Sequence, residues 1–186
     1  MAAIASVSLV ERLVPYEPAW NQSRRDVARD LAHALVNEGI AFGAASLTPM
    51  IVCGHGAWPL ALPRAAQLAL AIVIADLGVT LTHVASHRVA LLWRLHAVHH
   101  SVGRMYGLNG LVKHPLHLVI ELVVGTAPLA LLGMPPDVAG VLGYAVALQL
   151  LLQHSNIDLR SARWCTRGPS RRRIVTIIWR RRPTET

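Results

Sequence analysis

Four apolar stretches divide this 186-residue chain, and turn-forming or charged residues separate them. A helix rises about 1.5 Å per residue, so stretches of about 16 to 23 residues approach or match the roughly 30 Å hydrocarbon core of a membrane. Tight turns near Pro63 and Pro135 join the stretches in pairs. The pattern therefore predicts an all-α fold, an integral membrane four-helix transmembrane bundle made of two hairpins. The predicted spans are residues 40–62, 65–82, 116–133 and 138–153.

The segment before the first span has the pattern of a helix that lies on a membrane surface. Ser23 and Asp26 have the spacing of a capping box, and apolar residues recur every fourth position from Val27. We therefore expect residues 1–39 to form an N-terminal tail with an interfacial amphipathic helix. Residues 40–159 would then form the transmembrane domain.

Composition supports a membrane protein. Hydrophobic residues make up 53% of the chain, and the mean hydropathy of +0.42 is higher than that of an ordinary soluble domain of this size. Cys53 and Cys165 are too far apart in sequence to indicate a thiolate metal site. The net charge of +8 would suit nucleic acid in a soluble protein, yet half of the eighteen Lys and Arg residues lie after residue 159. We therefore expect a membrane as partner and no nucleic acid.

Histidines are concentrated in a short region beside the second span, where five of them fall within eighteen positions. The first two are four apart and so share one helix face, and the other three are related by three and four positions. Neutral imidazole is a ligand that suits iron, zinc, copper and nickel. The spacing therefore predicts a metal centre. The five residues are His83, His87, His96, His99 and His100.

Topology brings these histidines to one side of the membrane. With four spans and short turns on the opposite side, the segment between the second and third spans shares a side with both termini. Four Arg residues before residue 40 and four basic residues between 88 and 113 lie on this side, against Arg64 alone on the other. Cytoplasmic loops carry an excess of Lys and Arg. We therefore expect a multi-pass protein whose termini and histidine cluster are cytoplasmic.

Polar side chains in and beside the spans are further candidates. Asp76 lies within the second span, where a charged residue is costly and tends to be functional. It falls within about 60° of the first two histidines around the helix axis, so we expect it to support a metal ligand. His114 and His117 stand at the start of the third span, and His154 stands at the end of the fourth.

These residues resemble the fatty acid hydroxylase and sterol desaturase superfamily of membrane di-iron oxygenases. The resemblance covers about residues 65–159. The segment LHAVHHS matches an H-x-x-H-H box within a W-R-x-H-x-x-H-H-S pattern, and His83 with His87 matches an H-x-x-x-H box. KHPL is similar to the family's H-P-L-E segment, with His117 at the position of the acid, and QHSN is similar to its H-S-N segment.

The resemblance implies two irons that activate O2, so that a fatty acyl or sterol-like lipid is hydroxylated or desaturated. Zinc would be a substitute metal, and no catalytic residue is implied beyond the metal ligands. Electrons would come from a separate donor, because the sequence has no flavin or nicotinamide fingerprint. Asp76, Asn156 and His117 would support the ligands. The implied ligands are His83, His87, His96, His99, His100, His114 and His154.

The chain departs from the family pattern at its end. The family carries a third box, another H-x-x-H-H, after H-S-N, whereas this sequence has no histidine after His154. Residues 160–186 hold nine Arg and no Lys. We therefore expect this tail to be a shifted-frame or otherwise aberrant segment, and the enzyme to be inactive through loss of the third box. A basic anchor on anionic lipid is the alternative for the tail.

Two other functions stay open. A degenerate, non-catalytic relative would bind one zinc, or no metal, through a subset of these histidines. A b-type haem electron carrier would ligate haem through single histidines on facing spans, whereas the clusters here lie at helix ends. Two irons, one zinc and one haem are distinct stoichiometries, so a metal measurement separates the three functions.

Overall fold

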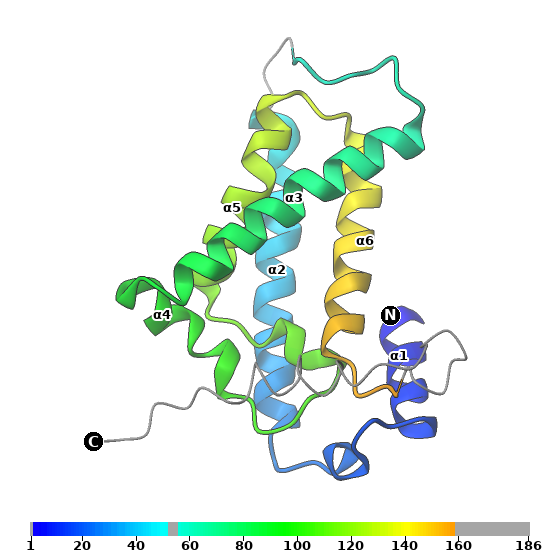
Figure 1. The fold of residues 1–186 in the computed structure, drawn as a ribbon, viewed down its shortest axis with the longest axis vertical. Coiled ribbons are helices and arrows are strands. Elements are labelled where there is room, and N and C mark those ends of the chain that lie inside the picture. Colours follow the sequence, from blue (N-terminus) through cyan, green and yellow to red (C-terminus); the bar gives the residue numbers. More distant parts are fainter. Residues whose placement is uncertain (1, 52–55, 159–186) are drawn as a thin grey trace, which may run out of the picture.

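The computed structural model describes residues 2–51 and 56–158, and six α-helices account for most of these residues (Figure 1). The α-helices are α1 (Ala2–Leu13), α2 (Val27–Ile51), α3 (Arg64–Ser86), α4 (Ala90–His96), α5 (Pro115–Leu131) and α6 (Pro136–His154). Three 3-10 helices lie between them, η1 (Pro18–Asn21), η2 (His99–Ser101) and η3 (Gly107–Leu111). The only extended pairing in the described ranges is an isolated bridge between Pro15 and Ile157. The predicted all-α fold is therefore confirmed for these residues.

Two helices in the described part of the chain are long and apolar enough to cross a membrane, by length and composition. α3 has 23 residues and α6 has 19, and both are strongly apolar. α5 is also apolar but has 17 residues. These three helices coincide with the second, third and fourth predicted spans, while the four-helix transmembrane bundle stays a prediction.

α2 joins two segments that we expected to be separate at residue 39. The predicted interfacial helix and the start of the first predicted span share one continuous helix of 25 residues. Its inner side is polar, since Asp30 is 0% and Asn37 is 2% exposed, whereas Leu35 and Phe42 are 68% and 77% exposed. An apolar outer side around a polar inner side is the reverse of a soluble helix and suits contact with lipid.

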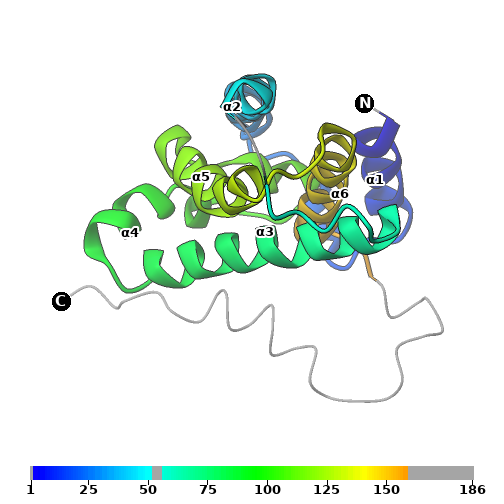
Figure 2. The same cartoon turned by 90° about the horizontal axis from the view of Figure 1, so that it is seen from above.

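α5 lies between α2 and α3, and α6 packs against α3 (Figure 2). Gly78 lets the backbones of α3 and α5 approach closely, because a Cβ at this position would lie 2.6 Å from the Val124 carbonyl oxygen. The apolar core lies where α3 and α6 begin and α5 ends, so the histidines occupy the opposite end of the helices. Its buried residues are Trp58, Ala71, Ala75, Leu129, Val138 and Leu142.

The N-terminal segment binds both the end of α6 and the segment between α4 and α5. The buried carboxylate of Glu11 accepts the backbone N–H groups of Gly107 at 2.7 Å and of Asn156 at 2.9 Å. The buried side chain of Asn156 accepts the N–H of Glu17 at 3.0 Å and donates to the Glu17 carbonyl and to Asn21. These contacts fix the direction in which the chain leaves α6, directly after His154.

Candidate metal centre

Four histidines from α3, α4 and η2 converge at the end of the bundle, and one ligand nitrogen from each lies within 4.8 Å of the others. The chain reverses between α3 and α4, where the N–H groups of Arg88 and Val89 donate to the Ala85 carbonyl at 2.9 and 2.8 Å. This reversal places the end of α4 against the end of α3. The members of this four-histidine cluster are His83, His87, His96 and His100.

Two of the spacings within the four-histidine cluster match those expected around a single metal ion. The Nε2 atoms of His83 and His87 are 3.2 Å apart, and those of His96 and His100 are 3.0 Å apart. Four imidazoles bound tetrahedrally at about 2.0–2.1 Å from a zinc ion would place their nitrogens roughly 3.3 Å from one another. The donor set is also appropriate, because imidazole suits iron and zinc.

Burial and neighbouring histidines keep two members of the cluster, His96 and His100, in the neutral form that binds metal. Burial, with a smaller effect of the neighbouring His83, lowers the pKa of His96 from 6.5 to about 2. Burial and then the neighbouring His87 lower the pKa of His100 to about 4. Both imidazoles are therefore neutral at pH 7, and a metal ion need not displace a proton from them.

A second pair of histidines, His99 and His154, lies beside this cluster. Their Nδ1 atoms lie 3.3 Å from the Val112 carbonyl oxygen and 2.9 Å from the Leu150 carbonyl oxygen, respectively. A carbonyl only accepts, so each Nδ1 carries a hydrogen, and in a neutral ring each Nε2 then presents a lone pair. The two Nε2 atoms face each other at 3.3 Å. Facing lone pairs repel unless a cation lies between them, so this pair is a second candidate metal position.

His117 lies behind the four-histidine cluster and is fully buried. Its ring centroid is 4.6 Å from that of His96, and its Nε2 is 2.9 Å from the Ser86 hydroxyl oxygen. Beside it, the Lys113 Nζ donates to Glu121 Oε2 at 2.6 Å. Sequence reasoning missed Ser86, Lys113 and Glu121 as parts of the site. The ion pair could have been predicted from the sequence, because a Lys precedes the start of an apolar helix and a Glu lies shortly after it.

Three other predicted site residues lie outside these groups. The Nδ1 of His114 accepts the Leu116 N–H at 3.2 Å and so caps the start of α5. Asp76 accepts a hydrogen bond from Gln149 of α6 at 3.2 Å. The side chain of Asn156 binds the N-terminal segment. Helix periodicity placed Asp76 on the face of the α3 histidines, yet its hydrogen-bond partner comes from a different helix.

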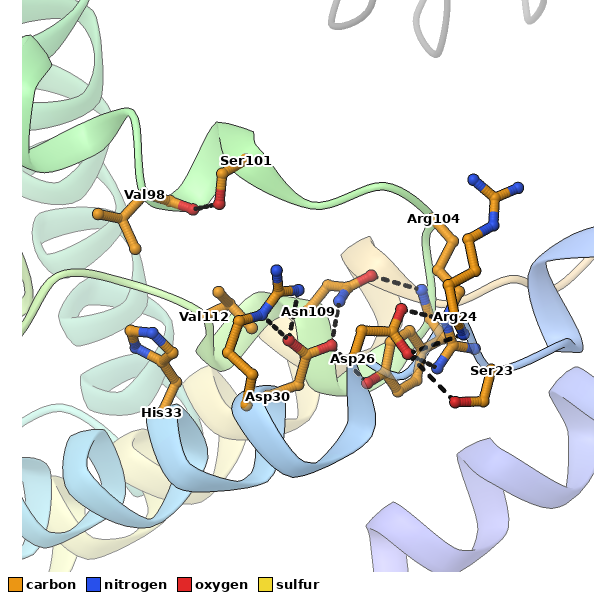
Figure 3. Close-up of polar contacts among 12 residues, drawn as sticks. Ser23, Arg24, Asp26, Asp30, His33, Val98, Ser101, Arg104, Asn109 and Val112 are labelled. Atoms are coloured by element: carbon orange, nitrogen blue, oxygen red, sulfur yellow. Dashed lines mark hydrogen bonds and ion pairs between the residues drawn. The ribbon is translucent and has the colours of Figure 1, made fainter.

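A polar network anchors the segment between α4 and α5 to the start of α2 (Figure 3). Arg104 donates to both carboxylate oxygens of Asp26, at 2.7 and 3.0 Å, and to the Trp20 carbonyl at 2.7 Å. The Tyr106 hydroxyl donates to Asp30 at 2.6 Å. The hydrogen bond from Arg104 is the main cause that lowers the pKa of Asp26 from 3.8 to about 2. The network fixes the segment that carries η2 and η3, and thereby two histidines of the site.

Comparison with known proteins gives one family and one similar protein. The family model described as fatty acid hydroxylase matches residues 68–177, so the match continues beyond residue 159, where we expected the resemblance to end. Ornithine lipid hydroxylase OlsE of Rhizobium tropici is 35% identical over 173 residues, which cover 87% of this chain and 52% of that protein. The chain thus spans about half the length of this curated relative. No solved structure matches.

Proposed function

The chain belongs to the fatty acid hydroxylase family, and on this premise we propose that it is a membrane oxidoreductase that hydroxylates a lipid at a metal centre held by histidines. The observation that supports this most is the convergence of four imidazole nitrogens within 4.8 Å. Helices α3 and α6, the candidate membrane spans, both end at the histidines. A metal centre at that end would meet lipid at the membrane surface.

Iron is the metal that we propose, and bound iron would supply the activation of dioxygen. The four-histidine cluster would hold one ion, and His99 with His154 would contribute to the position of a second. The protein's own part is to fix the imidazoles and, through burial, to keep His96 neutral. Electrons would come from a separate donor protein, because the sequence contains no flavin or nicotinamide fingerprint.

An ornithine-containing lipid is the substrate that we favour. This substrate is supported by the similarity to an ornithine lipid hydroxylase, which is 35% identical over 87% of this chain. Since the chain spans about half of that relative, the substrate is best tested against a panel. The panel should contain ornithine lipids, phospholipids with different acyl chains, and sterol-like lipids.

The test combines lipid analysis with metal measurement. The wild-type chain, His100→Ala and the control His55→Ala are expressed in a bacterial host supplied with the panel lipids, and lipid extracts are compared by mass spectrometry. We expect the wild type and His55→Ala to add one oxygen atom to a panel lipid, and His100→Ala to add none. Wild-type protein that contains iron, yet modifies no lipid when a suitable electron donor is present, would refute the hydroxylase assignment.

A non-catalytic relative that binds one zinc is the second candidate. The two metal positions favour it, because they differ in the number of ligands. The first position has four convergent imidazoles, enough for one zinc, whereas the second has two among the described residues. Metal analysis of the purified chain separates the candidates. One zinc per chain, unchanged after growth in iron-rich medium, would support the second candidate against the first.

A further inference from the structure

Two neighbouring buried imidazoles each have a nitrogen without a hydrogen-bond partner. In the described part of the chain these atoms are Nδ1 of His96 and Nδ1 of His117. Their ring centroids are 4.6 Å apart and the ring planes are inclined by 33°. A buried polar atom without a partner is costly and uncommon, and two such atoms in neighbouring rings suggest a common explanation.

Ser86 determines which nitrogen of His117 carries the hydrogen. The Ser86 hydroxyl has one hydrogen, and it donates this hydrogen to the Thr82 carbonyl at 2.8 Å. The same oxygen lies 2.9 Å from His117 Nε2, so there it must accept. His117 Nε2 therefore carries the hydrogen, and in the neutral ring Nδ1 is an acceptor that faces the interior.

His96 carries its hydrogen on the other ring nitrogen, Nδ1, because of its position in the cluster. Its Nε2 lies 3.0 Å from the Nε2 of His100, inside the four-histidine cluster, and is the atom that would bind metal. A neutral imidazole that binds metal through Nε2 carries its hydrogen on Nδ1. The unpartnered atom of His96 is then a donor, and the unpartnered atom of His117 is an acceptor.

We infer that His117 is a positioning residue, whose Nδ1 accepts a hydrogen bond from Nδ1–H of His96 when the cluster holds metal. The inference rests on the proposed function, because it requires a metal in the cluster. Metal-binding histidines generally donate their second N–H to an outer partner that sets the ring orientation. One chain of hydrogen bonds would then run from the metal ligand His96 in α4, through His117 in α5, to Ser86 at the end of α3.

The ion pair beside His117 does not occupy its Nδ1. Glu121 Oε1 is 3.5 Å from His117 Nδ1, which is longer than a hydrogen bond of good geometry. The other carboxylate oxygen is bound by the Lys113 ammonium at 2.6 Å. Glu121 therefore already has a cationic partner, and the Nδ1 of His117 remains available to His96.

Three variants of the 186-residue chain, purified in detergent, test the inference. His117→Phe keeps a ring of similar size without an acceptor, and His117→Gln restores an acceptor oxygen. Gln67→Met is the matched control, because it removes a buried, hydrogen-bonded side chain at the opposite end of α3. Binding of Zn²⁺ is measured by competition with a chelator, the visible spectrum of bound Co²⁺ reports ligand geometry, and the melting temperature reports folding.

We expect His117→Phe to weaken Zn²⁺ binding by about 10- to 100-fold, the usual effect of losing an outer partner of a ligand. His117→Gln should recover most of the affinity and a Co²⁺ spectrum close to that of the wild type, and Gln67→Met should bind Zn²⁺ normally even if it melts earlier. Unchanged affinity in His117→Phe, or equal losses in both His117 variants, would overturn the positioning role alone. A wild type that binds neither metal would overturn the proposed function as well.

Discussion

The buried ion pair between Lys113 and Glu121 gives the most direct test of how this end of the bundle is stabilised. Their side chains are only 11% and 6% exposed, and the charged atoms are 2.6 Å apart. Lys113→Met leaves a buried carboxylate without a cation, which typically costs about 3–5 kcal/mol. For a chain of this size, about 2–4 °C per kcal/mol predicts a melting temperature lower by about 6–20 °C.

The double variant Lys113→Met/Glu121→Gln is the control, because it removes both charges and leaves no uncompensated ion. We expect it to melt closer to the wild type than Lys113→Met does, since replacing both partners of a buried pair is often nearly neutral. Thermal unfolding of the purified chains in one detergent, followed by circular dichroism, measures all three. If the double variant melts as early as the single variant, the loss comes from packing and the electrostatic argument is wrong.

Four further predictions concern other parts of the chain. Gly78→Leu should lower the melting temperature far more than Gly140→Leu, because a Cβ at Gly78 meets the Val124 carbonyl at 2.6 Å whereas nothing lies within 4 Å at Gly140. Arg104→Met should destabilise the chain above pH 3.8, and its difference in melting temperature from the wild type should narrow as Asp26 is protonated toward pH 2. A cysteine at the exposed Ser101, in a background without native cysteines, should react with impermeant reagents only from the cytoplasmic side. Translating the coding DNA beyond residue 158 in the other two frames tests the shifted-frame tail: an H-x-x-H-H box in either frame would support it and predict that this chain hydroxylates no lipid, whereas the absence of a box from both frames would exclude it.

The parts of the fold that depend on local periodicity are those that could be predicted from sequence. Helices α3, α5 and α6 begin at residues 64, 115 and 136, where apolar stretches were expected from 65, 116 and 138. Pro115 starts α5 because its missing N–H costs nothing at the first helical position. The spacing of four between His83 and His87 likewise yields the predicted shared face, with their Nε2 atoms 3.2 Å apart.

Contacts between distant segments account for what could not be predicted. The bond from the Asn156 N–H to Glu11 joins residues 145 apart, and no periodic pattern encodes such a pairing. The helix boundary expected at residue 39 is not observed, because α2 runs without a break from Val27 to Ile51, and its buried residues Asp30, Ala34 and Asn37 lie in its first half. Asn37 donates to the carbonyls of Leu111 and Lys113 at 2.7 and 3.1 Å. These bonds join α2 to a segment more than 70 residues away, so they could not be predicted from the local sequence.

The distribution of polar groups connects these contacts with the metal centre. The segment between α4 and α5 has no α-helix, and its residues 109–113 are buried, so its carbonyls need donors that the apolar helices lack. α2 supplies one in Asn37, while Val112 receives the Nδ1–H of His99. The carbonyls that bind α2, Leu111 and Lys113, therefore flank the carbonyl of Val112 that orients a candidate ligand. Asn37→Leu removes the hydrogen bonds between α2 and this segment, so it should reduce the affinity for Zn²⁺ although the side chain contacts no histidine of the cluster. Normal Zn²⁺ binding in a folded Asn37→Leu chain would show that the segment holds the ligands without α2.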